Sequence, residues 1–222
     1  MQASPMRPEA LLAIRSDIAS TVESEYLAWL TKEHTLERVS IEGFVSARIF
    51  RSQQDGFGRY LILYALADET VVDSQAYLDR LNNPTPWSAR MMPHLGNFVR
   101  GGGKITTLSG FGHGAVLVAI MTTSKIYAQR KQGIEAISEV PGVVAIRVLK
   151  TDSKRTTVGS SERKLRSGDH SFEMLMMIET FDISTAKDAG KKIPPKFSDA
   201  LESGPISHEI AVYSQIFSLN GQ

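Results

Sequence analysis

The sequence contains no cysteine in its 222 residues. This absence excludes disulfides, thiolate metal sites and a cysteine nucleophile, and it agrees with a reducing compartment. No apolar run approaches the roughly 18–20 residues that a membrane-spanning helix needs. The opening residues, MQASPMRPEA, lack the apolar centre of a signal peptide. We therefore expect a cytoplasmic protein that has no membrane partner.

An excess of charge of either sign is also missing. The chain has 25 Lys and Arg residues against 24 Asp and Glu residues, which gives a formal net charge of +1. Such a balance provides no general attraction to nucleic acid, so we expect no nucleic-acid partner. Apolar residues make up 42% of the chain and charged residues 22%, which is typical of an ordinary globular protein.

A repeat is the most informative feature that the chain does have. Gly43 and Arg48 recur as Gly142 and Arg147 at the same separation, within the similar stretches IEGFVSARIFRS and EVPGVVAIRVLKTD. Each stretch is followed, after a polar loop, by another apolar run. We predict that one fold unit is used twice, with a first unit over residues 1–112 and a second over residues 113–222.

Hydrophobic periodicity predicts the same order of elements, β-α-β-β-α-β, in each half. The first half has expected strands at residues 10–14, 45–49, 60–67 and 104–112, and expected helices at 20–36 and 73–81. The second half has expected strands at residues 115–122, 143–149, 172–181 and 206–219, and expected helices at 125–138 and 184–191. Residues 84–100, interrupted by three prolines, have no counterpart in the second half and could hold one or two helical turns. Residues 151–170 are polar and charged, which is typical of a mobile loop.

This order of elements is that of the ferredoxin-like unit, so the predicted fold class is α+β. Helices cover only one face of its four-stranded antiparallel sheet, and the other face would leave apolar side chains in water. Two tandem units packed sheet to sheet hide that face and close a barrel-like interior. Exposed sheet edges would also permit a homodimer.

Residues 25–50, EYLAWLTKEHTLERVSIEGFVSARIF, resemble the opening helix and strand of the EthD-like group in the dimeric α/β-barrel superfamily. Tyr26, Trp29, the Glu33-His34 pair and the run from Gly43 to Arg48 carry this resemblance, which extends over residues 10–110 and fades in the second half. It implies a cavity between sheet and helices that holds small, often aromatic, molecules. The repeat would place Gly133 at the position of His34, so we expect a single cleft in the chain.

His34 is the first candidate for catalysis, because a neutral imidazole can move a proton near physiological pH. Glu37 and Arg38 follow at i+3 and i+4 and would share its helical face, where a carboxylate could fix the imidazole tautomer. The alternative is that His34 only ends the helix and bonds its carbonyls. The predicted catalytic set is His34, Glu37 and Arg38.

A second group is expected to bind substrate. Arg90 and His94 are four residues apart, so a helical turn would present both beside Trp87, and such a pair could hold a carboxylate or phenolate. Arg100 follows in the same segment. The alternative is a loop whose arginines bond backbone carbonyls. The resemblance adds Tyr26 and Trp29 as substrate-binding residues, whereas the repetition of Arg48 as Arg147 favours a structural role for both.

Metal chemistry is not expected, because His113, His170 and His208 have no partner at metal-ligand spacing. Haem is the rival cofactor, since one histidine in a barrel pocket suffices as an axial ligand. The leading hypothesis is a cofactor-independent enzyme that acts on a small aromatic or carbonyl-bearing metabolite by His-mediated proton transfer. A lyase, isomerase, decarboxylase and cofactor-free oxygenase all stay open. The alternative is a non-catalytic protein that binds a small molecule or haem in the same cavity.

Overall fold

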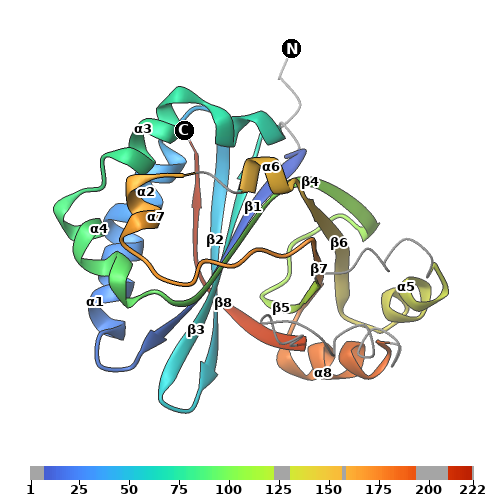
Figure 1. The fold of residues 1–222 in the computed structure, drawn as a ribbon. Helices are drawn as coiled ribbons and strands as arrows, with labels where there is room; N and C mark the ends of the chain where they lie inside the picture. The colour runs from blue at the N-terminus through green and yellow to red at the C-terminus, as the bar shows by residue number, and fades with distance from the viewer. Residues whose placement is uncertain (1–7, 123–130, 157–158, 194–209, 222) are drawn as a thin grey trace.

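Eight antiparallel strands close into a barrel in the computed structural model, which describes residues 8–122, 131–156, 159–193 and 210–221. The strand order around the barrel is β1-β3-β2-β8-β5-β7-β6-β4 (Figure 1). The strands are β1 (Ala10–Ala19), β2 (Phe44–Gln54), β3 (Phe57–Leu66), β4 (Gly96–Gly110), β5 (Val116–Thr122), β6 (Val143–Thr151), β7 (Met174–Thr180) and β8 (Ile210–Asn220). The fold class is therefore α+β, built on an antiparallel barrel.

Two helical layers cover the outside of the barrel on opposite sides (Figure 1). The larger layer covers the first-half strands and contains α1 (Glu23–Trp29), the π-helical turn η1 (Leu30–His34), α2 (Thr35–Val39), the 3-10 turn η2 (Glu69–Asp73), α3 (Gln75–Asn82), α4 (Pro86–Met91) and η3 (Met92–His94). The smaller layer contains α5 (Lys131–Ser138) and α8 (Ile183–Lys191). Two short helices, α6 (Ser153–Thr156) and α7 (Ser161–Lys164), connect β6 to β7.

The buried core has three parts that follow from this arrangement. One fills the barrel interior and includes Phe50, Leu61 and Leu175. A second lies between the first-half strands and their helices, and a third lies under α5 and α8. Successive side chains on a strand point to opposite faces, so every strand here has one face toward the interior and one toward a helical layer.

The two halves use the same strand order. The first-half strands follow each other as β4-β1-β3-β2, and the second-half strands as β8-β5-β7-β6. Strands β2 and β8 join the halves on one side, and β4 and β6 join them on the other.

Several predicted boundaries differ from the observed ones. The single helix predicted over residues 20–36 is three consecutive segments, α1, η1 and α2, because a π-helical turn interrupts the α-helical hydrogen-bond pattern. The first strand is longer than predicted and runs from Ala10 to Ala19. Residues 96–100, predicted to belong to the irregular segment, begin β4. Parts of two predicted elements, residues 125–130 and 206–209, lie outside the described residues.

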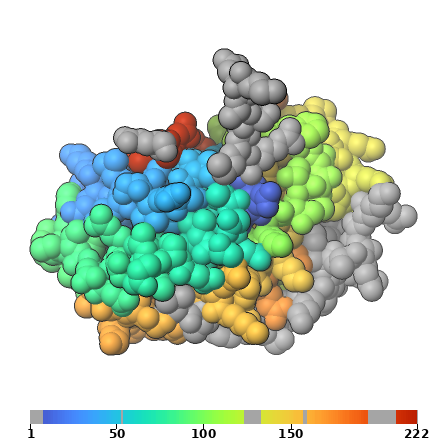
Figure 2. Space-filling view, turned by 90° about the horizontal axis from the view of Figure 1, so that it is seen from above, coloured from blue at the N-terminus to red at the C-terminus, as the bar shows by residue number. Residues whose placement is uncertain are grey.

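The connection between β6 and β7 differs most from its prediction as a mobile loop. Its described part forms α6 and α7 and packs against the first-half helices, where the backbone N–H of Ser161 donates to Oδ1 of Asn82 at 3.2 Å. Figure 2 shows this orange segment along the green helices of the first half. Charged residues in the connection are buried there, and Glu162 is only 5% exposed. The second half thus covers part of the first.

None of the helices in the described part of the chain is long and apolar enough to cross a membrane.

Candidate functional site

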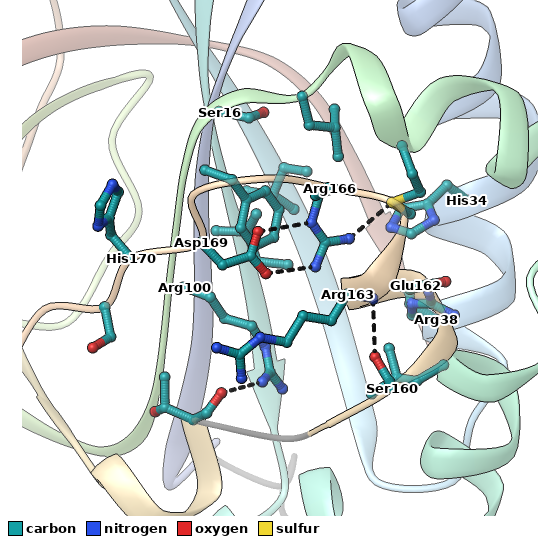
Figure 3. A pocket seen from close by; sticks show the side chains of 18 of the residues that line it. Ser16, His34, Arg38, Arg100, Ser160, Glu162, Arg163, Arg166, Asp169 and His170 are labelled. Carbon is teal, nitrogen blue, oxygen red and sulfur yellow. Dashed lines mark hydrogen bonds and ion pairs between the residues drawn. The ribbon is translucent and has the colours of Figure 1, made fainter.

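A cavity of about 100 Å³ lies between the outer face of the first-half strands and their helical layer. Its floor comes from β1, β3 and β4, and one wall comes from α1, η1 and α2. The connection between β6 and β7 closes it from outside with residues 160–171 (Figure 3). We call this space the His34 cavity. It is a composite of both halves of the chain.

His34 lies at the end of the π-helical turn and lines the cavity. Such turns are rare and occur frequently at functional sites. The imidazole is 5% exposed and lies against the indole of Trp29, with 4.3 Å between ring centroids. Trp29 is itself held by a hydrogen bond from its Nε1 to Oγ of Ser88 at 3.1 Å. The position of the imidazole is therefore set by packing on a fixed ring.

The His34 imidazole is uncharged at neutral pH. Burial lowers its pKa well below the ordinary 6.5, and the positive charges of Arg38 and Arg166 lower it further. Its Nδ1 atom is buried and has no hydrogen-bond partner among the described residues. A buried polar atom without a partner is rare in native proteins and calls for an explanation. The unpaired nitrogen belongs to a side chain that lines the cavity.

Arg38, one turn after His34, forms a buried ion pair with Glu162 of α7. Both residues are almost fully inaccessible, at 3% and 5% exposure. The pair joins the first-half helix α2 to the connection contributed by the second half. It therefore fixes the cover of the cavity at a point beside the imidazole.

Arg166 is held on the same cover by several contacts. It makes a two-point ion pair with Asp169, at 3.2 Å and 3.1 Å, and its guanidinium lies 4.0 Å from the centroid of the Phe98 ring. Its remaining nitrogen donates to the sulfur of Met92 at 2.9 Å. Figure 3 shows this guanidinium between Asp169 and His34. The three guanidinium nitrogens of Arg166 therefore already have hydrogen-bond partners within the protein.

Two further arginines at the cavity have no carboxylate partner among the residues that the structure describes. Arg100 donates to the backbone oxygen of Thr156 at 2.6 Å and to the hydroxyl of Tyr77 at 3.2 Å. Arg163 has no side-chain hydrogen bond or ion pair within the described ranges, and Figure 3 shows its guanidinium on the same side of the cavity as that of Arg100. Guanidinium groups bind carboxylates and phenolates through fixed pairs of donors. This side of the cavity suits an anionic group.

The structure brings together five of the nine residues predicted to form the site. The residues that line the His34 cavity are His34, Arg38, Tyr26, Trp29 and Arg100. Burial raises the pKa of Tyr26 above its usual 10.0, so that its hydroxyl stays protonated there.

Four predicted residues lie outside the cavity. Glu37 does not bond the imidazole of His34 and instead pairs with Arg80 at 3.3 Å. Helix α4 turns Ser88 and Met91 toward the core, which leaves Arg90 61% exposed beside Glu25. The other two, Trp87 and His94, are respectively half-buried and exposed away from the cavity. The face of α4 that packs inward carries neither Arg90 nor His94, so the structure does not bring this predicted pair to the His34 cavity.

The prediction from sequence also missed residues. The acidic and basic side chains of the connection that close the cavity are Glu162, Arg163, Arg166, Asp169 and His170. Their one sequence signal is a dense mixture of charges after a potential helix cap at Ser160, whose hydroxyl accepts from the backbone N–H of Arg163 at 3.2 Å. That signal does not indicate which distant helix the segment covers.

The sequence matches no protein-family model and no curated protein. Solved structures do share the fold. An anthrone oxidase-like protein aligns with 96% of this chain and 93% of its own, at 11% identity and a TM-score of 0.52. A chlorite dismutase-like protein aligns over 95% and 96%, at 14% identity and a TM-score of 0.51.

At such low identity, these neighbours show the fold alone. This chain shares the barrel architecture of both neighbours. The narrower resemblance to the EthD-like group stays a prediction.

Neither a metal nor haem is favoured by the site. The described residues contain no group of three or more His, Asp or Glu side chains that could hold a metal ion, and His208 lies outside them. A porphyrin is much larger than the cavity of about 100 Å³. For scale, a cavity of ~150 Å³ lined by apolar side chains accommodates benzene. The His34 cavity is smaller than this, so it fits a molecule no larger than one small ring.

Proposed function

We propose that the His34 cavity binds a small aromatic or carbonyl-bearing molecule with an anionic group, and that His34 moves a proton on it without a cofactor. One observation carries this proposal. A buried, uncharged imidazole with an unpaired nitrogen lies in the wall of a cavity where two guanidinium groups have no carboxylate partner among the described residues.

The arrangement suits removal of a proton from carbon next to a carbonyl group. The neutral imidazole accepts the proton, and negative charge develops on the carbonyl oxygen as an enolate forms. Arg100 and Arg163 are in place to stabilise that charge, and fixed donors in a closed site do so more strongly than water. The developing enolate would also favour the imidazolium, which offsets the low pKa of His34.

The fate of the enolate decides the reaction class. Reprotonation at another atom gives an isomerase, and loss of a leaving group from the neighbouring carbon gives a lyase. In a decarboxylase the enolate forms by loss of carbon dioxide instead, and a proton then adds to it at the site of His34. Reaction with oxygen gives a cofactor-free oxygenase, and the anthrone oxidase-like neighbour favours including an aromatic ketone among the candidate substrates. The isomerase, the lyase and the oxygenase share proton removal by His34 as their first step.

The proposal extends to the organisation of the chain. We infer that the chain consists of two tandem ferredoxin-like units, residues 1–112 and 113–222, and the common strand order supports this division. The first unit holds the His34 cavity, and the second supplies its cover. A homodimer and a cytoplasmic location stay predictions.

Hydrogen–deuterium exchange tests the shared first step. Pyruvate has a carboxylate and acidic hydrogens next to a ketone and is small enough for the cavity, so it serves as the probe. We expect the protein to accelerate exchange of those hydrogens in deuterium oxide, followed by proton NMR. His34→Gln should return the rate to the uncatalysed value, whereas His94→Gln, at an exposed histidine outside the cavity, should leave it unchanged.

Two results would count against proton transfer. If the His34→Gln variant exchanges as fast as the unmodified protein, the imidazole is not the base. If the probe binds to the unmodified protein but does not exchange, the alternative of a non-catalytic binding protein is favoured. The low pKa of His34 makes it a weak base, and this observation favours the non-catalytic binding protein.

A further inference from the structure

A second polar cluster lies inside one end of the barrel, away from the His34 cavity. The repeat-related arginines Arg48 of β2 and Arg147 of β6 both reach Glu179 of β7, at 2.9 Å and 2.6 Å. Their side chains are only 11% and 12% exposed, and that of Glu179 is 3% exposed. The repeat in the sequence therefore converges in space on one buried carboxylate.

The cluster also holds the junction between the halves. Glu179 accepts from the backbone N–H of Gly114 at 2.7 Å. Arg48 donates to the backbone oxygen of Gly114, and Arg147 to that of Gly112, each at 2.8 Å. These bonds give the cluster a defined geometry.

The charges in the cluster do not balance. Two guanidinium groups share one carboxylate, and within the described ranges no other carboxylate lies within ion-pair distance of either. Burial lowers the pKa of Arg48, Glu179 opposes that shift, and Arg147 adds to it. The two arginines and Glu179 together carry a net positive charge in a poorly hydrated place, so an additional anion would stabilise this arrangement.

The strand register shows where that anion belongs. On β6 and β7, Arg147 pairs with Met177 and Ala145 pairs with Glu179. On β2 and β3, Arg48 pairs with Leu63 and Ser46 pairs with Ala65, with a register shift at the same place. Ala65 is therefore the counterpart of Glu179. The second half supplies a carboxylate at this position, and the first half supplies only a methyl group.

A cavity lies beside Ala65 and the arginine cluster. Its volume is about 620 Å³, and it is lined by Arg48, Arg147, Glu179 and Ala65. Apolar side chains, among them Leu11, Leu63 and Ile105, form the remainder of its wall. It shares no lining residue with the His34 cavity, which lies outside the barrel wall. Figure 1 shows the barrel that separates the two regions.

We propose that this barrel-end cavity binds a small carboxylic acid with an apolar body. The carboxylate takes the place opposite Glu179 that Ala65 leaves free and pairs with the surplus guanidinium charge. The apolar body lies against the aliphatic side chains of the barrel interior. The proposal is independent of proton transfer at His34.

Benzoate and benzamide are suitable probes, because they have nearly the same shape and differ in charge. We expect calorimetry to show benzoate binding at least about tenfold more tightly than benzamide, since a hydrogen bond to a charged group contributes roughly 1.5–3 kcal/mol. Arg147→Gln should weaken benzoate binding about tenfold or more. It leaves the Arg48–Glu179 pair intact, so the variant should fold.

Ala65→Glu gives the sharper test, because it supplies the missing carboxylate within the chain. We expect this variant to lose benzoate binding and to melt about 2–4 °C higher, as expected for about 1 kcal/mol in a chain of this length. Ala65→Gln adds the same volume without the charge and should not raise the melting temperature. A rise in both variants would mean that volume rather than charge is missing.

The site of benzoate binding is decided by Arg163→Gln, which alters the His34 cavity alone. Loss of benzoate binding in Arg163→Gln, with full binding in Ala65→Glu or in Arg147→Gln, would assign the anion to the His34 cavity and overturn the proposal. No detectable benzoate binding to the unmodified protein would overturn it as well. Binding that survives Arg163→Gln and is lost in Arg147→Gln supports it.

Discussion

The ion pair between Arg38 and Glu162 offers a direct test of how the two halves are held together. Its side chains are 4% and 6% exposed, so water screens it very little. Replacing Glu162 with Gln keeps the shape but leaves the Arg38 charge buried without compensation. Removal of one partner of a buried pair typically costs about 3–5 kcal/mol. We expect Glu162→Gln to lower the free energy of unfolding by that amount.

Urea denaturation with a matched exposed pair measures the effect. Lys191 and Asp188 lie 2.8 Å apart but are 75% and 56% exposed, so Asp188→Asn should cost less than about 1 kcal/mol. The double variant Arg38→Met with Glu162→Leu removes both charges and should recover most of the loss. If Glu162→Gln costs no more than Asp188→Asn, the connection is not anchored as the structure indicates, and the closed form of the His34 cavity would be wrong.

Three further predictions concern single residues. Because burial and two arginines lower the folded-state pKa of His34 well below 6.5, the unfolded chain binds its proton first as the pH falls. Stability should therefore fall below about pH 6.5 by up to ~1.4 kcal/mol per pH unit, a loss that His34→Gln should reduce in urea titrations at acid and neutral pH. Arg163→Gln should weaken binding of pyruvate about tenfold in calorimetry, whereas Arg90→Gln, at an exposed arginine, should not; equal effects would contradict the assigned anion side. Gly43→Ala should cost more than about 1 kcal/mol, because φ is +90° and the new methyl would lie 2.5 Å from a valine side chain. Gly190→Ala, in a helix with open space around it, should instead add roughly 0.5–1 kcal/mol in thermal melts.

Much of the architecture could be read from local patterns. Alternating apolar residues locate most strands, and Gly43 and Gly142, with φ values of +90° and +91°, mark the same turn in both halves. The π-helical turn before His34 could not be predicted, because no composition signal separates it from an α-helix. Its origin lies in tertiary packing, where Trp29 and His34 are buried together against the strands.

The site was only partly predictable for a physical reason. His34 and Arg38 are near each other in sequence, so their common helical face follows from periodicity. The cover comes from residues more than a hundred positions away, and its contact with α2 depends on the closed barrel. A charged segment such as residues 151–170 is ordinarily solvated. Burial of Glu162 becomes favourable only because Arg38 provides a buried ion-pair partner.

Repetition followed by divergence explains why one chain has two dissimilar cavities. Where the halves retained the same residue, as at Arg48 and Arg147, the side chains meet at the barrel end and share Glu179. Where they differ, as at Ala65 opposite Glu179, a cavity with surplus positive charge is left. The His34 cavity arises from a difference of another kind, since the long connection of the second half covers helices of the first. In both cavities arginines outnumber carboxylates, and anionic molecules are the ligands that such an imbalance favours.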